Sequence, residues 1–175
     1  KGPELFNVLK EQQAKGLITK IGISIYSPQE LDLLFSKFNF DLVQAPYNVF
    51  DRRLSSSGWL NTLFNLKVEI HVRSIFLQGL LLVNLKNHPN YFQQWEEHFE
   101  AWEKWLVETG AAPLEACLKF ALAHKEIDRV VVGVANLSQL QEIVDCTTKE
   151  NTLVAPDFRI EDINLLNPSN WKELK

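Results

Sequence analysis

The chain has 175 residues, enough for one domain, and its 46% hydrophobic and 23% charged residues are ordinary for a globular protein that buries a core. A formal net charge of -4 and a pI near 5.6 argue against a nucleic-acid or anionic-membrane binder, because such proteins need excess Lys and Arg to neutralise phosphate. No apolar run approaches the roughly 20 residues that span a bilayer, and the N-terminus shows no signal-peptide pattern. The two cysteines, Cys117 and Cys146, match no metal or redox spacing, so we expect reduced thiols and a cytoplasmic location.

The first predicted elements are a helix, a strand and a second helix. A helical apolar face over residues 4–15 stops at Gly16, a residue that commonly follows a helix end. The β-branched run Thr19–Ser24 predicts a short strand. Ser27 then offers a hydroxyl cap, and Glu30 can close a capping box at the start of the next helix.

The middle of the chain repeats this alternation and then departs from it. Residues 41–48 and 67–74 predict strands, with a helix over 59–66 between them. A longer excursion follows, in which residues 91–108 carry an aromatic stripe at helical spacing and another helix opens at Pro113. The stripe consists of Phe92, Trp95, Phe99, Trp102 and Leu106. We interpret it as core rather than as a cofactor site.

The last predicted unit is a strand over 129–134, followed by a helix capped by Asn136. From residue 151 the chain becomes an irregular tail, which we expect to pack back on the body. Strands that alternate with helices should be parallel, because a crossover helix returns the chain to start each strand in the same direction.

The predicted strands have one apolar and one polar face. In the third strand Ile70 and Val72 oppose Glu69, His71 and Arg73. A doubly wound sheet should be apolar on both faces, whereas the interior of a barrel accepts polar side chains near its active-site end. The sequence therefore predicts the α/β class and a parallel (β/α) barrel, present as about half a barrel of four βα units.

The polar row of the third strand needs partners if it is buried. We expect Glu69 and His71 to form a structural ion pair and Arg73, nearest the open end, to contact a ligand, because its donor fork suits a carboxamide, phosphate or carboxylate. The remaining histidines are expected to be solvated: His88, His98 and His124.

Several common catalytic motifs are absent from the sequence. There is no G-x-G-x-x-G and no G-x-x-x-x-G-K-[ST], and Ser24 and Ser74 have no neighbouring His and Asp in nucleophile order. One possible function is that of a barrel enzyme that handles phosphorylated substrates. Such an enzyme should have a glycine-rich phosphate loop after the last strand, and this sequence has none. No metal-ligand spacing is present either.

Four stretches, in order and spacing, resemble the C-terminal half of the aldo-keto reductases, NAD(P)H-dependent oxidoreductases built on a (β/α) barrel. They are Gly16–Ser24 (GLITKIGIS), Leu42–Asp51 (LVQAPYNVFD), Val72–Leu82 (VRSIFLQGLLL) and Val130–Glu142 (VVVGVANLSQLQE). The resemblance implies that these are the fifth to eighth strands and the loops that hold the cofactor. Residues 1–175 would then be the C-terminal half of a (β/α)8 barrel domain, with 151–175 as its tail.

The resemblance also implies which residues bind the cofactor. Ser24 and Gln44 occupy positions that bind the nicotinamide carboxamide, and Arg73 falls where many members stack a tyrosine on the nicotinamide ring. The following loop, which lies along the pyrophosphate, contributes Ser74, Phe76, Gln78 and Gly79. The last-strand region, which meets the adenosine phosphate, contributes Gly133 and Gln139.

The sequence departs from the family pattern at both ends of this site. Ile25 replaces an asparagine that often reaches the carboxamide, and Arg73 adds a charge that could meet the pyrophosphate or an acidic substrate. Val134 and Gln139 offer no positive charge for a 2′-phosphate, and Ile143 replaces a frequent asparagine. The choice between NADP and NAD therefore stays open.

The family's catalytic aspartate, tyrosine, lysine and histidine come from four strands that would precede Lys1, and Tyr26, Tyr47 and Tyr91 do not stand in the matching context. We therefore nominate no catalytic residue. We expect the cofactor-binding half of an enzyme that reduces aldehydes or ketones, inactive alone, whose partners are a small carbonyl substrate and either the N-terminal half or a second copy. The alternative is a non-catalytic half-barrel module that pairs with another half.

Overall fold

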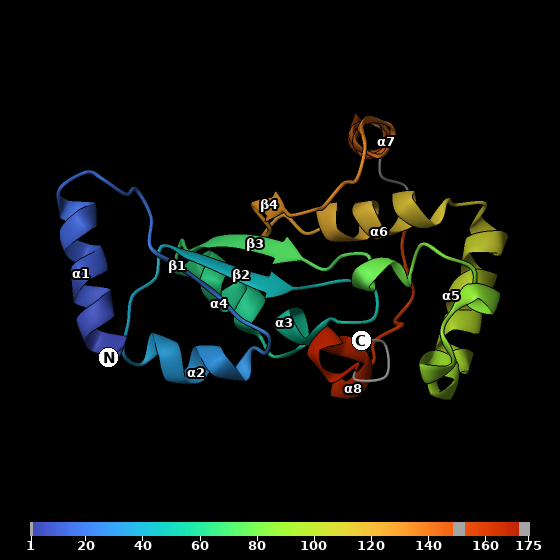
Figure 1. The fold of residues 1–175 in the computed structure, drawn as a ribbon, viewed down its shortest axis with the longest axis horizontal. Helices are drawn as coiled ribbons and strands as arrows, with labels where there is room; N and C mark the ends of the chain where they lie inside the picture. Colours follow the sequence, from blue (N-terminus) through green and yellow to red (C-terminus); the bar gives the residue numbers. More distant parts are fainter. Residues whose placement is uncertain (1, 149–152, 172–175) are drawn as a thin grey trace.

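The computed structural model describes residues 2–148 and 153–171, and its centre is a four-stranded sheet in the order β1-β2-β3-β4 (Figure 1). The strands are β1 (Gly22–Ser24), β2 (Leu42–Pro46), β3 (Glu69–Arg73) and β4 (Arg129–Val130). The α-helices are α1 (Gly2–Ala14), α2 (Gln29–Phe35), α3 (Arg53–Ser56), α4 (Trp59–Asn65), α5 (Glu96–Thr109), α6 (Pro113–Leu122), α7 (Leu137–Thr148) and α8 (Ile163–Leu166). The 3-10 helices are η1 (Leu77–Gly79), η2 (Leu85–Asn87), η3 (Asn90–Trp95) and η4 (Pro168–Asn170).

All strand pairs are parallel, as the alternation of strands and helices predicts. The register places Ser24 beside Gln44, and Pro46 beside Arg73. The carboxyl ends of β1, β2 and β3 therefore meet at one edge of the sheet, where the polar candidate residues were expected.

The strand predicted over 129–134 is wrong beyond its first residues, since β4 ends at Val130. Val131 N still donates to Val72 O at 2.7 Å. The backbone of β3 then turns at Ser74, whose φ is +59°, so residues 132–134 have no neighbour with which to continue the ladder.

One face of the sheet is covered by helices and forms a closed core. Val43, Ile70 and Val72 on this face are each 0% exposed. The helical side chains that pack on them come from α2, α4, α6 and α7: Leu31, Leu60, Leu63, Leu118, Ala121 and Ile143. At about 25 cal/mol per Å² of buried apolar surface, this face is a main source of stability.

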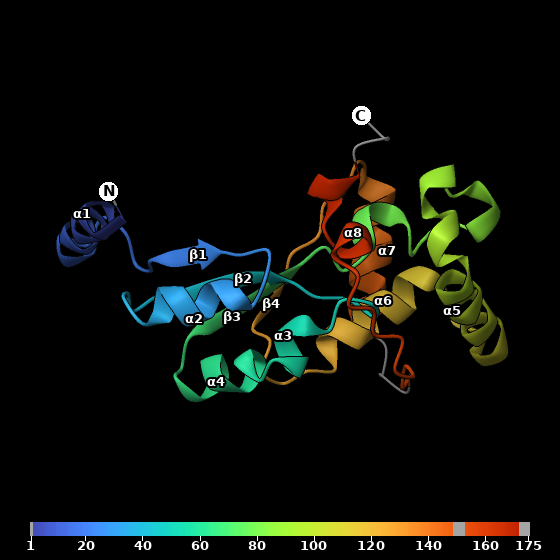
Figure 2. The ribbon, with the colours of Figure 1, turned by 90° about the horizontal axis from the view of Figure 1, so that it is seen from below.

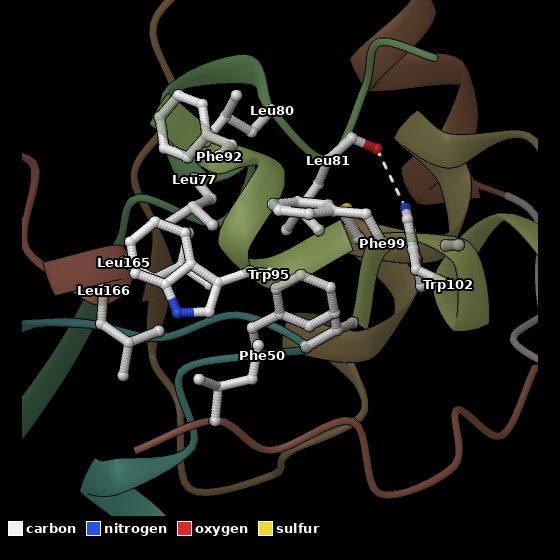
Figure 3. Packing of buried hydrophobic residues seen from close by; sticks show 14 of the residues in the cluster. Phe50, Leu77, Leu80, Leu81, Phe92, Trp95, Phe99, Trp102, Leu165 and Leu166 are labelled. Atoms are coloured by element: carbon white, nitrogen blue, oxygen red, sulfur yellow. Dashed lines mark hydrogen bonds between the residues drawn. The ribbon is translucent and has the colours of Figure 1, made fainter. Parts of the chain in front are cut away.

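A second core lies beyond the carboxyl ends of the strands (Figure 3). We call it the aromatic core, because seven buried Phe and Trp side chains pack in it among aliphatic ones. All five members of the predicted aromatic stripe are buried in it, which confirms their interpretation as core. The helix predicted over 91–108 is split into η3 and α5. The tail packs here through Leu165, Leu166 and Trp171, as expected, although residues 149–152 and 172–175 lie outside the described residues.

Helix α1 lies away from the sheet, on the side where the strands start (Figures 1 and 2). It buries no residue, and Leu5 and Val8 on its apolar face are 61% and 51% exposed. At α2, Glu30 accepts the backbone N–H groups of Tyr26 and Ser27, but the Ser27 hydroxyl contacts Gln29 rather than capping the helix. None of the helices in the described ranges is long and apolar enough to cross a membrane.

Candidate functional site

The face of the sheet opposite the covered core carries polar side chains within reach of solvent. Ser24 is exposed, and Gln44 and Arg73 are half-buried. The Ser24 Oγ donates to Gln44 Oε1 at 3.3 Å, between residues that the β1–β2 register places side by side. The ends of three neighbouring strands therefore bring a hydroxyl, an amide and a guanidinium onto one surface.

Arg73 reaches across the end of β2 toward β1. Its Nη2 donates to Ile25 O at 3.0 Å, its Nη1 donates to Ser74 Oγ at 3.2 Å, and its guanidinium carbon lies 4.8 Å from the Tyr26 ring centroid. No carboxylate pairs with it among the described residues. Arg73 is thus held in place by neutral groups, and its positive charge remains available to a ligand.

The other two members of the polar row contact each other, but through a hydrogen bond rather than the expected ion pair. His71 Nε2 lies 2.7 Å from Glu69 Oε1, and Lys20 also contacts Glu69. Burial, followed by the charge of Arg129, lowers the pKa of His71, so a neutral imidazole donates its Nε2–H to the carboxylate. This pair lies toward the start of β3, away from Ser24 and Arg73, and its structural role stays a prediction.

The turn after β3 carries an unusual backbone conformation. Ser74, Leu77, Gln78 and Gly79 all have positive φ, between +47° and +93°. Residues other than glycine rarely adopt a positive φ, which costs on the order of 1 kcal/mol or more for each residue. The side chain of Leu77 is 1% exposed and packs in the aromatic core, which holds the strained turn in place. Strain of this kind persists only where surrounding contacts enforce it, and it clusters at binding sites.

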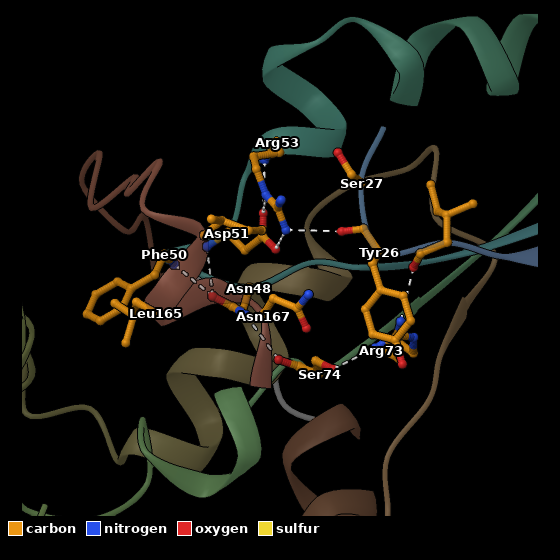
Figure 4. A network of polar contacts seen from close by, with 12 residues as sticks. Tyr26, Ser27, Asn48, Phe50, Asp51, Arg53, Arg73, Ser74, Leu165 and Asn167 are labelled. Atoms are coloured by element: carbon orange, nitrogen blue, oxygen red, sulfur yellow. Dashed lines mark hydrogen bonds and ion pairs between the residues drawn. The ribbon is translucent and has the colours of Figure 1, made fainter. Parts of the chain in front are cut away.

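A buried polar network fastens this turn to the loop after β2 (Figure 4). Asn48 donates to Ser74 O at 3.0 Å and accepts the backbone N–H groups of Phe50 and Asp51. Asp51 in turn holds Arg53 through two bonds of 2.7 and 2.8 Å, and Arg53 donates to Tyr26 O at 3.2 Å. The network joins the segments after β1, β2 and β3.

Sequence reasoning did not identify Asn48, Asp51 and Arg53 as residues of the site. The available signal was the Asn-x-x-Asp spacing after a strand, which is typical of a side chain that caps a turn. It could predict the local turn, but not the bond from Asn48 to Ser74, which joins two segments that are separate in the sequence.

A cavity of about 600 Å³ lies between the strained turn, the start of α6, the segment after β4 and the first turns of α7. Its lining includes six of the nine residues predicted to hold the cofactor: Ser74, Phe76, Gln78, Gly79, Gly133 and Gln139. The other three, Ser24, Gln44 and Arg73, lie on the open face. The bond from Arg73 to Ser74 links the two groups.

At this cavity, side chains at the start of α7 accept hydrogen bonds from the backbone N–H groups of the same segment. Asn136 Oδ1 accepts from Gln139 N at 2.9 Å, as its predicted role as a cap requires, and Gln139 Oε1 accepts from Ala135 N at 2.8 Å. Glu142 and Ile143, one turn further on, also line the cavity.

The expectation of solvated histidines is wrong for two of the three. His88 bonds Leu80 O through Nε2 at 3.0 Å, and its buried Nδ1 has no partner among the described residues. His124 Nε2 lies 2.9 Å from the buried Tyr47 hydroxyl, and burial lowers its pKa. Both histidines pack on aromatic rings that the sequence pattern does not place beside them.

Cys117 and Cys146 are free thiols, and burial raises the pKa of Cys117. Within residues 2–148 and 153–171, no group of three or more His, Cys, Asp or Glu side chains could hold a metal ion.

Comparison with known proteins gives one family. The model of the aldo/keto reductase family matches residues 2–161. A search of curated proteins finds no match.

Solved structures with the same fold are also aldo-keto reductases. The apo form of AKR11C1 from Bacillus halodurans is 22% identical with a TM-score of 0.67, over 87% of this chain and 53% of that one. A thermostable aldo-keto reductase, Tm1743, in complex with the inhibitor epalrestat, is 19% identical with a TM-score of 0.62, over 93% of this chain and 52% of that one. The chain thus has the fold of an aldo-keto reductase barrel in part, and it spans about half the length of these structures.

Proposed function

The chain belongs to the aldo/keto reductase family, and on this premise we propose that it supplies the cofactor-binding half of an NAD(P)H-dependent oxidoreductase that reduces aldehyde or ketone groups. The domain assignment follows from the same proposal: residues 1–175 form the C-terminal half of a (β/α)8 barrel, with 151–175 as its tail. The substrate is a small carbonyl compound.

One observation carries this proposal. Nine residues chosen for one ligand, from separate parts of the sequence, fall either on the open ends of β1 to β3 or around one adjoining cavity. A cavity of about 600 Å³ is within the usual range for cofactor and small-molecule sites. Together, the open face and the cavity offer an elongated site, which suits a dinucleotide.

The polar groups of the site fit the parts of a nicotinamide dinucleotide. Ser24 and Gln44 would bind the carboxamide, since a hydroxyl and an amide can each donate and accept. Arg73 would present a flat cation to the ring or to the pyrophosphate. The backbone N–H groups of Ile75 and Phe76, in the strained turn, have no acceptor among the described residues and can donate to phosphate oxygens.

Bound there, the dinucleotide supplies the hydride that carbonyl reduction requires. The residues of this chain bind and orient the dinucleotide and exclude water from the cavity side. Tyr47 is 1% exposed on the covered face and Tyr91 packs against the aromatic core, so neither is placed to give a proton to a substrate. Tyr26 is exposed beside Arg73, but it does not stand in the sequence context of the family's catalytic tyrosine. We therefore assign the proton donor to the N-terminal half of the barrel and expect this chain alone to be inactive.

The proposal is tested by titrating the chain with NADH and following nicotinamide fluorescence. Binding should be saturable, and the double variant Ser24→Ala, Gln44→Ala should weaken it by about tenfold, because two hydrogen bonds are lost. Ser36→Ala, on the exposed end of α2, is the matched control and should bind like the parent. If neither NADH nor NADPH binds, the proposal is contradicted.

A second candidate is a non-catalytic module that assembles from two half-barrels, the partner being an N-terminal half or a second copy. It is favoured by exposed apolar side chains on the helices next to each end of the sheet: Leu5 and Val8 on α1, and Leu137 and Val144 on α7. The strands β1 and β4 each have a free edge. Sedimentation of a folded 20.2 kDa monomer that binds NADH would remove its support.

A further inference from the structure

The backbone carbonyl of Ser74 is held by buried groups (Figure 4). Its oxygen accepts two hydrogen bonds, from Asn48 Nδ2 at 3.0 Å and from the backbone N–H of Leu77 at 2.9 Å. Both donors belong to residues that are 1% exposed. A carbonyl oxygen has two lone pairs, so this one is fully used and faces the inside of the molecule.

The direction of this carbonyl sets the direction of the next backbone N–H group. The peptide bond between Ser74 and Ile75 is planar and trans, so its C=O and its N–H point to opposite sides. Because Ser74 O faces Asn48, the N–H of Ile75 faces away from Asn48. Ser74 and Ile75 line the cavity beside the turn, whereas Asn48 does not. The N–H of Ile75 has no acceptor among the described residues and is therefore available to a ligand in the cavity.

The other contacts of the turn do not fix this orientation. Ile75 packs under the covering helices and Leu77 packs in the aromatic core, but both contacts are apolar and involve side chains. Arg73 bonds the hydroxyl of Ser74 rather than its backbone. Ser74 has a φ of +59°, which serine rarely adopts, so conformations of lower energy become available to it when the bond to Asn48 is lost.

We propose that Asn48 is a positioning residue, which orients the N–H of Ile75 toward a phosphate oxygen of the bound dinucleotide without touching the ligand. The inference rests on the proposed function, in which this turn lies along the pyrophosphate. A hydrogen bond to a charged phosphate is stronger than one between neutral groups. If only a fraction of the molecules presents this N–H, the apparent Kd rises by the inverse of that fraction.

The test compares the parent chain with Asn48→Ser in calorimetric titrations with NADH and with ADP-ribose, which has the pyrophosphate but no nicotinamide. The substitution keeps a hydroxyl oxygen near the N–H groups of Phe50 and Asp51 and removes the donor to Ser74 O. Both ligands should bind about tenfold more weakly to this variant. Urea unfolding confirms that each chain is folded under the conditions of the titrations.

The matched control is Asn170→Ser, in the tail. It removes the same kind of bond, from Asn170 Nδ2 to Ile163 O at 3.2 Å, at a position outside the cavity lining. It should bind NADH and ADP-ribose like the parent. An equal loss in both variants would show that Asn48 has no special part in binding.

Asn48→Asp supplies a rescue that a purely structural role would not produce in a folded chain. An ionised carboxylate cannot donate to Ser74 O, whereas a protonated carboxyl can. Burial disfavours the ionised form, so lowering the pH from about 8 to about 5 should restore the affinity for ADP-ribose, relative to the parent at the same pH. Affinity that does not recover would overturn the role of this donor.

The parent alone gives an independent measurement, which does not depend on how the variants fold. Saturating ADP-ribose should move the amide signal of Ile75 in nuclear magnetic resonance spectra, and a signal that stays in place would overturn the inference. Weaker binding of NADH alone, with ADP-ribose unaffected, would also overturn it, because the loss would then lie at the nicotinamide end. If the parent binds neither ligand, the proposed function itself fails.

Discussion

The two faces of the sheet differ in what covers them and, as a result, in what they can do. On one face Ile70 and Val72 are fully buried under helices. On the other, His71 and Arg73 alternate with these residues along β3 and, like Gln44 on β2, keep partial access to solvent. Polar groups that stay solvated cost little free energy, so the open face can carry recognition groups while the covered face stabilises the fold.

The largest loss of stability should follow when a side chain buried on the covered face is truncated. Ile70→Ala should lower the free energy of unfolding by about 4 kcal/mol, because the side chain is 0% exposed and its removal leaves a void. Gln44→Ala, on the open face, should change it by no more than about 0.5 kcal/mol. Urea unfolding measures both, and similar losses would break the distinction between the faces.

A slightly smaller loss of stability is expected in the polar network of Asn48, Asp51 and Arg53, which joins the segments after β1, β2 and β3. Asp51→Asn should lower the free energy of unfolding by about 3 kcal/mol, because it weakens the pairing of Arg53, whose side chain is only 11% exposed. Glu108→Gln removes a charge from a far more exposed pair with Lys104 and should cost less than about 1 kcal/mol. Equal losses would show that Asp51 does not act through burial.

The open face itself should respond in binding rather than in stability. Arg73→Gln should weaken NADH binding by about tenfold and lower the free energy of unfolding by less than about 1 kcal/mol, because Arg73 contacts only neutral groups at the end of β3. Arg129→Gln, at an exposed position on β4, is the control. If both variants bind NADH equally well, Arg73 does not contact the dinucleotide.

The smallest effect is the change that His124 causes in the free energy of unfolding as the pH varies. Burial lowers the pKa of His124 below its ordinary value of 6.5, so the unfolded chain takes up a proton before the folded chain does. The free energy of unfolding should therefore fall as pH falls from 6.5 toward the lowered pKa. His124→Gln should make this dependence shallower, whereas His98→Gln, at an exposed position, should not. Urea unfolding at several pH values checks this.

The sequence could predict the two faces because side chains alternate along a strand with a period of two. This is why Ile70, Val72 and Arg73 were placed correctly from the pattern alone. It could not predict where β4 ends, because that depends on the turn of its neighbour at Ser74. Nor could it show that Leu5 on α1 is exposed, since periodicity marks an apolar face but not what covers it.

The candidate site was predictable only as far as single strands and loops allow. Ser24 and Gln44 follow from strand register and from the family resemblance. The bond from Asn48 to Ser74 and the carboxylate of Glu142 in the cavity depend on how distant segments pack, which local pattern does not specify.

The central claim is that the open face and its adjoining cavity bind a nicotinamide dinucleotide, and amide hydrogen exchange with and without NADH tests it most directly. Bound NADH should slow exchange in the segment after β1 and in the turn at 74–79 and leave exchange in α2 and α4 unchanged. Protection confined to α2 and α4, or no protection at saturating NADH, would contradict it.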